Sequence, residues 1–562
     1  MPRIALLSNV TVGMLAGMLE KQGEVYVSDG YDTWQQDIFN KTSGLYEAKP
    51  DAAVILLHGE DYLESFRSAE AGGKLLDQWR LAVSTFACAM PETPIFAASL
   101  DIRSSRCRYG SEINLDKYFE NRWIEAVQKL HQEGKRVYLL PVKELIEETG
   151  RQSFYSSKMW YMGSMPYSMK GMKALAELIG KYVSAARGGK KKCLAVDLDN
   201  TLWGGVIGED GLEGLVLSGH KEGARYQDTQ RILKKMQSQG VMLAILSKNN
   251  VEDVEGVFGH PDMVLREEDF AAKAINWKPK TENIRAMADT LNIGLDAFVF
   301  LDDNPAEREQ MKAECPEVAV IDFPRDTSKL PETVEKAYEE YFLTLEVTGE
   351  DRQKTAMYRS EAKRKAEREN TASVEDYLRN LEMRMDIHLM TEVEEERVVQ
   401  LVNKTNQFNL TTVRYSGKEI RQISEEDESS IITVHMSDKY GEQGLVAVVI
   451  LKEEGKTARI DTFLMSCRVM GRRAEDAIAA SLGGWLAKKG IERVTASYIR
   501  TAKNRPVETL YERLGFELEG TEGVKEESGY RKDYCILVNE LPKPPEVFCS
   551  IQEFEGNKEK EE

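Results

Sequence analysis

Two aspartates one residue apart are the clearest chemical feature of this sequence. Asp197 and Asp199 follow a short apolar stretch that begins at Cys193, and Thr201 stands two residues further on. Alternate side chains of a strand point the same way, so both carboxylates can face one site. One carboxylate can attack phosphorus while the second handles the proton of the leaving group, and a hard divalent cation can hold the phosphate. The pattern favours phosphoryl transfer, with an acidic turn that binds no metal as the alternative.

Two later segments also bring polar residues to the ends of apolar stretches, and a third places two lysines before an expected helix. One stretch leads to Ser247 and another leads to Asp302. Between them, Lys278 and Lys280 precede an amphipathic run for which Thr281 is a suitable helix N-cap. Parallel sheets gather ligands at the carboxyl ends of their strands. We therefore expect all of these side chains on one rim of a parallel sheet.

This order of motifs resembles the haloacid dehalogenase (HAD) phosphatase superfamily over roughly 150 residues. The resemblance implies that Asp197 is the nucleophile and forms an aspartyl phosphate. It implies that Asp199 is the general acid on the leaving oxygen and then the base on the incoming water or other acceptor. Ser247 and Lys280 would hold the transferring oxygens. Lys280 is preferred to Lys278 because it lies directly before the expected N-cap, where its ammonium can meet a phosphate on the helix end.

The same resemblance implies a Mg²⁺ cofactor. Its ligands would be Asp197, the backbone carbonyl of Asp199, and Asp302, with Asp303 nearby. Two more residues of these motifs are candidate substrate contacts: Thr201 and Asn249.

The spacing of the motifs leaves little room for a lid. Only 50 positions separate Asp197 from Ser247, and 33 separate Ser247 from Lys280, which suffices for one crossover helix and its loops each time. We expect no folded cap domain. An open site favours a bulky or protein-borne substrate over a small metabolite sealed from water.

The composition predicts a cytoplasmic protein of several domains. The 562 residues carry a formal net charge of −19, which argues against general nucleic-acid binding because that needs a basic surface. Seven cysteines without any C-x-x-C spacing indicate reduced thiols. No stretch approaches the ~20 apolar residues of a membrane span, so we expect no membrane partner.

The first part of the chain, 1–188, predicts an open, mostly parallel α/β domain. Apolar strand candidates at 4–7, 52–57, 95–98 and 137–140 alternate with helix-like segments at 12–21, 61–69, 75–89 and 115–134. It weakly resembles SGNH-type hydrolases, in which a nucleophilic serine follows the first strand, and Ser8 holds that place. The Asp-x-x-His element of those enzymes is not visible, so no base would activate Ser8. We expect a scaffold or partner-docking domain of flavodoxin or SGNH-like fold.

The remaining chain divides into a HAD-type α/β domain at 189–345, a solvated charged helical connector at 346–372, an α+β domain at 373–545 and a charged tail at 546–562. The third domain resembles GNAT acyltransferases in two places. An Arg468-x-x-Gly471 turn precedes a helix, and Asn504 and Tyr511 lie on a later segment. Such a turn cradles the pyrophosphate of coenzyme A. Arg473 stands where the family has Gly or Ala.

Nearly the whole chain resembles the FkbH-like family, subfamily IIIC of the HAD group, on the segments that begin at Asp197, Ile275, Phe300, Asn403 and Ser466. Members are implicated in polyketide-type assembly lines. The resemblance implies that the protein takes a glyceryl unit from 1,3-bisphosphoglycerate, a phosphorylated three-carbon substrate. It would remove phosphate and leave the glyceryl group as a thioester on an acyl carrier protein. The phosphopantetheine arm of the carrier, or coenzyme A, would enter the GNAT-like domain.

Several alternatives stay open for the function. Cys467 could accept the acyl group or be a buried structural thiol. Since carrier proteins are usually acidic, docking would need a basic patch such as Arg468, Arg472 and Arg473. The chain could instead be a Mg-dependent phosphatase of a small metabolite or glycan precursor. It could also be a non-catalytic assembly protein of a biosynthetic cluster.

Overall fold

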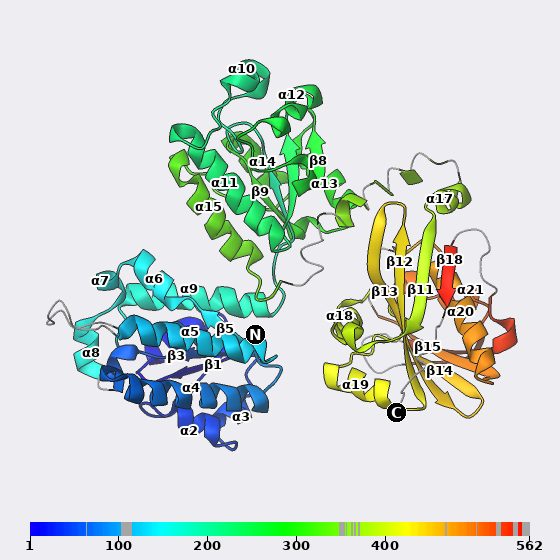
Figure 1. Cartoon of the computed structure of the whole chain (residues 1–562), viewed down its shortest axis with the longest axis horizontal. Coiled ribbons are helices and arrows are strands. Elements are labelled where there is room, and N and C mark those ends of the chain that lie inside the picture. Colours follow the sequence, from blue (N-terminus) through cyan, green and yellow to red (C-terminus); the bar gives the residue numbers. More distant parts are fainter. Residues whose placement is uncertain are drawn as a thin grey trace. The chain divides into compact units, whose positions relative to one another are not determined.

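The computed structural model divides into two compact units, residues 1–289 with 293–355, and residues 290–292 with 356–562 (Figure 1). It describes the whole chain except for 63–64, 103–114, 348–354, 356, 361–362, 365–366, 369–370, 372, 467–468, 502, 524–529, 543–548 and 554–562.

The first sheet is parallel throughout, with strand order β2-β1-β3-β4-β5. Its strands are β1 Arg3–Ser8, β2 Glu24–Val27, β3 Ala52–Leu56, β4 Ile95–Ala98 and β5 Val137–Leu140. Four of them coincide with the apolar stretches at 4–7, 52–57, 95–98 and 137–140, so the predicted open α/β architecture is confirmed here. The partly exposed strand β2 was not predicted, because its apolar run is only three residues long.

Helices cover both faces of this sheet, because alternate strand residues point to opposite sides. The helices are α1 Gly13–Leu19, α2 Trp34–Phe39, α3 Gly44–Ala48, α4 Ala69–Ala89, α5 Asp116–Gln132, α6 Val142–Thr149, α7 Arg151–Phe154, α8 Ser157–Gly163 and α9 Met169–Ala186. A helix expected at 61–69 is instead two 3-10 turns, Gly59–Tyr62 and Ser65–Arg67, and α4 starts only after its N-cap Ser68.

The second sheet positions the predicted phosphoryl-transfer motifs. It is parallel, with order β10-β9-β6-β7-β8. Its strands are β6 Cys193–Val196, β7 Met242–Ser247, β8 Phe270–Ile275, β9 Phe298–Leu301 and β10 Ala319–Val320. The three central strands are buried along their whole length, as expected for strands covered on both faces.

The helices around this sheet are α10 Ile207–Gly214, α11 Lys221–Ser238, α12 Val251–Glu255, α13 Lys280–Leu291, α14 Pro305–Glu314 and α15 Leu330–Ala337. Leu233 of α11 and Val334 of α15 pack on Leu194 and Leu243 in one apolar cluster. Between β6 and α11 the chain forms only a short loop, a bridge from Gly204 to Val216, and α10. No cap domain interrupts 189–345, all of which the structure describes.

The second unit holds a mostly antiparallel sheet of order β16-β17-β15-β14-β13-β12-β11-β18, in which β14 and β15, and also β11 and β18, run parallel. Its strands are β11 Met383–Leu389, β12 Ser429–Asp438, β13 Gly441–Glu454, β14 Thr457–Met465, β15 Arg493–Ile499, β16 Glu517–Gly523, β17 Tyr530–Leu537 and β18 Cys549–Glu553. Its helices are α17 Val374–Asn380, α18 Glu395–Lys404, α19 Gly417–Glu425, α20 Ala474–Lys488 and α21 Leu510–Arg513.

Two features here differ from the sequence prediction. Strand β18 lies inside the segment expected to be a charged tail, so the sheet continues past residue 545. Arg364, in the connector expected to be solvated, has only 3% of its side chain exposed and forms an ion pair with Asp438. Within the described residues, no helix is long and apolar enough to cross a membrane.

Candidate active site

Asp197, Ser247 and Asp302 lie side by side at the carboxyl ends of three neighbouring strands. Asp197 follows β6, Ser247 ends β7, and Asp302 follows β9, with β6 between the other two. The amide N–H of Asp197 donates to the carbonyl of Leu301 at 2.9 Å, which fixes the β6 end against the β9 end. All three residues are buried, so the rim of the sheet holds a compact polar centre inside an apolar core.

Lys280 lies at the middle of this centre. Its Nζ is 2.8 Å from Asp197 Oδ1 and 2.5 Å from Asp302 Oδ2, and its side chain is only 4% exposed. Lys278, in contrast, is exposed. Helix α13 begins at Lys280, two residues earlier than an N-cap at Thr281 would place it. Thr281 is therefore not the N-cap but donates its hydroxyl to Glu314 at 2.6 Å.

Burial and like charge raise the pKa values of the carboxylates. Burial raises the pKa of Asp197 to about 6, against the opposing effect of Lys280. Burial, and then the charge of Asp197, raise the pKa of Asp303 to about 6. Burial acts to lower the pKa of Lys280, but the ion pairs with Asp197 and Asp302 outweigh it, so the pKa is raised. The site thus holds a charged lysine among three carboxylates, whose excess negative charge favours the binding of a metal cation.

The donor set fits Mg²⁺. One carboxylate oxygen each from Asp197, Asp302 and Asp303 can be chosen so that all lie within 4.8 Å of one another, and hard oxygen ligands are those that Mg²⁺ prefers. The turn after β9 is held in place by Arg308, whose Nη1 donates to the carbonyls of Asp302 and Asp303, at 2.7 Å each.

Asp199 is oriented by three N–H donors. Trp203 Nε1 donates to Oδ1 at 2.9 Å and the amide of Ile207 donates to the same oxygen at 3.1 Å, while Asn249 Nδ2 donates to Oδ2 at 3.0 Å. The Asn249 amide also donates to Ser247 Oγ at 3.2 Å, so it links the two motif residues. Since Ile207 is the first residue of α10, that short helix is tied directly to the predicted acid–base residue.

The predicted substrate contacts differ in their surroundings. Thr201 is fully buried, and its hydroxyl has no hydrogen-bond partner among the described residues. Asn249 lies in the site through its bonds to Asp199 and Ser247. Trp203, Ile207 and Arg308 were missed by sequence reasoning. Trp203 stands two residues after Thr201, and this closeness to the motif in the sequence could have identified it as a residue of the site.

In the GNAT-like segments, the described candidate residues make contacts within the fold instead of facing a ligand site as predicted. Cys467 and Arg468 lie outside the described residues. Gly471 has φ +76°, a left-handed conformation that favours glycine at this turn. Arg473, at the N-cap of α20, is also left-handed and pairs with Asp476. The buried Arg472 donates to Gln443 at 2.9 Å, so it cannot form part of a surface basic patch.

Asn504 and Tyr511 are buried rather than facing a groove. The Asn504 amide donates to the carbonyls of Asn409 and Ile499, and its oxygen accepts from the amide of Thr501. Tyr511 is 1% exposed within the main apolar cluster, and burial raises the pKa of its hydroxyl. These contacts indicate that Asn504 and Tyr511 support the fold rather than bind pantetheine.

Ser8 is at the carboxyl end of β1, as predicted. It is buried, and its hydroxyl donates to the carbonyl of Leu56 at 2.6 Å. Because its hydroxyl is hydrogen-bonded to the backbone, Ser8 is better explained as a structural residue than as a nucleophile.

No family model matches the chain, and no curated protein does either. Among solved structures, the chain is similar to the N-terminal part of the protein BF1531 from Bacteroides fragilis, which contains a phosphatase domain and is complexed with Mg. The two are 26% identical, the match covers 61% of this chain and 94% of that chain, and the TM-score is 0.56. This likeness supports the predicted HAD-like phosphatase domain.

Acetyltransferases match a smaller part. The ribosomal-protein-S18-alanine N-acetyltransferase of Escherichia coli is 11% identical and covers 31% of this chain and 98% of its own, with a TM-score of 0.23. Spermidine N-acetyltransferase of Vibrio cholerae, in complex with CoA and spermine, is 13% identical and covers 28% of this chain and 97% of its own, with the same TM-score.

Proposed function

We propose that the chain is a Mg-dependent phosphoryl-transfer enzyme of FkbH-like type, which dephosphorylates a unit derived from 1,3-bisphosphoglycerate and loads glyceryl onto an acyl carrier protein. One observation carries the phosphoryl-transfer part of the proposal. Lys280 lies between Asp197 and Asp302 at a carboxylate-rich strand rim, which is the arrangement a transferring phosphoryl group needs around it.

In the first half of the reaction, an Asp197 carboxylate oxygen attacks phosphorus and the bond to the leaving oxygen breaks. Asp199 gives its proton to that oxygen, and the product alcohol leaves behind an aspartyl phosphate. Lys280 and Ser247 neutralise and position the phosphoryl oxygens. When bound by Asp197, Asp302 and Asp303, Mg²⁺ would supply further charge neutralisation for the phosphate.

In the second half, Asp199 takes a proton from a water molecule, which attacks the phosphorus and frees Asp197 and inorganic phosphate. The three N–H donors to Asp199 keep its carboxylate close to the same point in both halves. Acyl transfer is a separate step. The carrier thiol attacks the carbonyl carbon of the acyl phosphate, the thioester forms, and phosphate leaves with the bonding electrons while the thiol proton passes to the departing phosphate or to water.

Exposed apolar side chains near the site support a protein-borne substrate. Trp277, on the loop before Lys280, is 68% exposed, and Val251 and Leu212 on α12 and α10 are also exposed. The elements that carry them follow strands at the same rim, and none of the three side chains belongs to the apolar core cluster. Soluble proteins seldom gather large apolar side chains on one rim without a partner surface.

A second candidate is a phosphatase that acts on a small metabolite or glycan precursor. The burial of Asn504, Tyr511 and Arg472 favours it, because these side chains cannot then line a groove for a pantetheine arm. Under this candidate the second unit is a scaffold.

The test uses purified protein with Mg²⁺, 1,3-bisphosphoglycerate and a carrier protein in its phosphopantetheine form. We expect phosphate release and a carrier mass increase of one glyceryl group. Asp197→Asn, a near-isosteric change, should reduce phosphate release far more than tenfold, which is ~1.4 kcal/mol of barrier. Retention of more than about a tenth of the wild-type rate would refute the nucleophile assignment.

Trp277→Ser separates the two candidate functions. It should impair the carrier-dependent reaction and leave hydrolysis of a small phosphate ester unchanged. If phosphate is released and the carrier never gains mass, even with the wild-type enzyme, the small-substrate phosphatase stands.

A further inference from the structure

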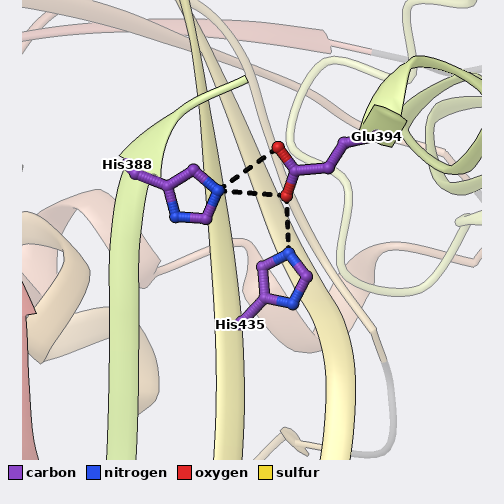
Figure 2. A group of neighbouring side chains, drawn as sticks. All are labelled: His388, Glu394 and His435. Atoms are coloured by element: carbon purple, nitrogen blue, oxygen red, sulfur yellow. Dashed lines mark hydrogen bonds and ion pairs between the residues drawn. The ribbon is translucent and has the colours of Figure 1, made fainter. Parts of the chain in front are cut away.

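Two of the six histidines and one glutamate meet in the second unit, and none of the three belongs to the phosphoryl-transfer or GNAT-like motifs (Figure 2). His388 Nε2 lies 3.1 and 3.2 Å from the two carboxylate oxygens of Glu394, and His435 Nε2 lies 2.6 Å from Oε1. The two imidazole rings are stacked, with centroids 5.5 Å apart. Both rings therefore direct the same nitrogen at one carboxylate.

The strand register brings the histidines together. In the antiparallel pair β11–β12, Asp386 is opposite His435 and His388 is opposite Thr433, so His388 and His435 are diagonal neighbours on one face. On β11, the residues of the opposite face, such as Met385 and Ile387, are buried in the apolar core. The polar set is thus a separate feature of the outer face of the sheet.

Glu394 is fixed by its own turn. It ends the 3-10 turn Glu392–Glu394 before α18, and its Oε2 accepts from the amide and the hydroxyl of Thr391, at 2.8 Å each. On the other side, Asp386 Oδ1 lies 3.5 Å from His388 Nδ1. A carboxylate on Nδ1 is the usual outer partner of a metal-binding histidine, because it leaves the Nε2 lone pair directed at the ion.

The distances fit an ion at the centre of the three groups. One ligand atom from each residue can be chosen so that all lie within 4.8 Å of one another. Around a tetrahedral Zn²⁺ with bonds of ~2.0–2.2 Å, ligand atoms lie about 3.3 Å apart. The His388–Glu394 separation already matches, and His435 has to withdraw by about 0.7 Å.

The cluster opens into a cavity of about 820 Å³. Arg384, Ser437, Glu442 and Ile551 line it together with the three side chains, and Val393 at its edge is 93% exposed. A metal ion with three protein ligands would keep a coordination position facing this space, as open sites do.

We propose that His388, Glu394 and His435 form a mononuclear site for a divalent transition-metal ion, with Zn²⁺ as the ion that fits best and an open position toward the cavity. Two imidazoles with one carboxylate are a donor set for zinc and other transition metals, whereas Mg²⁺ prefers oxygen alone. The site is independent of the proposed phosphoryl transfer.

The test uses the full chain, stripped with a chelator and titrated with Co²⁺ and then Zn²⁺ in excess Mg²⁺, which occupies the oxygen-only site. We expect one Co²⁺ per chain with a visible absorption band, displaced by Zn²⁺. His388→Ala, His435→Ala and Glu394→Ala should each abolish the band. Asp386→Asn should weaken binding by about tenfold or more. His220→Asn, a change at an exposed histidine of the first unit, is the matched control and should leave binding unchanged.

X-ray absorption of the wild-type Zn²⁺ complex keeps the proposal testable if a variant fails to fold. It should show two imidazole nitrogens and at least one oxygen. Three results would overturn the proposal: no stoichiometric binding, binding that persists in folded Glu394→Ala, or a band lost equally in Asp302→Ala. The first of these would mean that the three groups form only an ion-pair network.

Discussion

Replacing Lys280 by Met removes the positive charge between two buried carboxylates while it keeps a side chain of similar length. Asp197 and Asp302 have 8% and 0% of their side chains exposed, so water cannot replace the lost ammonium. Removing one partner of a buried ion pair typically costs about 3–5 kcal/mol, because the other charge stays buried and unpaired. We expect a loss of stability of this size in chelator, together with loss of phosphate release.

The pH dependence of this loss has a definite sign. Lys280 acts to lower the pKa of Asp197, which burial raises to about 6. Without the lysine the pKa rises further, so the folded variant takes up a proton more readily than the wild type. The cost of the substitution should therefore be largest above the raised pKa of the variant, shrink as the pH falls from there toward 6, and stay level below 6, where Asp197 is protonated in both proteins.

Hydrogen exchange of peptides covering β6 and β9 measures the effect locally. Since each 1.4 kcal/mol is a factor of ten, we expect exchange in chelator to accelerate by about a hundredfold to a few thousandfold. Lys248→Met is the control. Lys248 also pairs with a carboxylate, Glu307, at this rim, but its side chain is 33% exposed and it pairs with one carboxylate rather than two, so the expected cost is smaller. Wild-type exchange rates in Lys280→Met above pH 6 would refute the reasoning.

Three further predictions concern other parts of the protein. Mg²⁺ affinity, measured by calorimetry, should fall as the pH falls below 6, because Asp197 and Asp303, with pKa values of about 6, must lose protons to bind metal. For each proton released on binding, the affinity should fall by up to about tenfold per pH unit; an affinity independent of pH would contradict this. Trp203→Phe removes a donor to Asp199 and should lower kcat by about tenfold to a hundredfold, with little change in KM; a change confined to KM would assign Trp203 to substrate binding. Asn504→Ala should destabilise residues 356–562 by about 1–3 kcal/mol in denaturant unfolding and leave phosphate release unchanged; an unchanged stability would restore its predicted binding role.

The phosphoryl-transfer rim could be predicted because Asp197, Ser247 and Asp302 each end or directly follow a buried strand. In a parallel sheet this position alone places Asp197, Ser247 and Asp302 at one edge. Lys280 could be chosen over Lys278 because a helix start directs it toward the same edge. The pattern did not predict the start of helix α13 correctly, because the helix begins two residues before the expected place.

Other features depend on contacts that sequence spacing does not encode. His388 and His435 are 47 positions apart and meet only through the register of β11 and β12. Asn504 matches a motif position, but its amide is used entirely inside the fold, which becomes visible only when the carbonyl of Asn409 is placed beside it. Residues with hydrogen-bonding side chains can thus satisfy a motif and still be structural.

Strand β18 also protects β11 from unwanted pairing. It runs along β11 from Cys549 beside Met383 to Glu553 beside Ile387, and so saturates backbone groups that would otherwise end the sheet. A free strand edge is a template for other chains, and self-association and aggregation are its usual results. A chain shortened to end at residue 545 should therefore form strand-paired oligomers, seen by light scattering, at concentrations where the full chain does not.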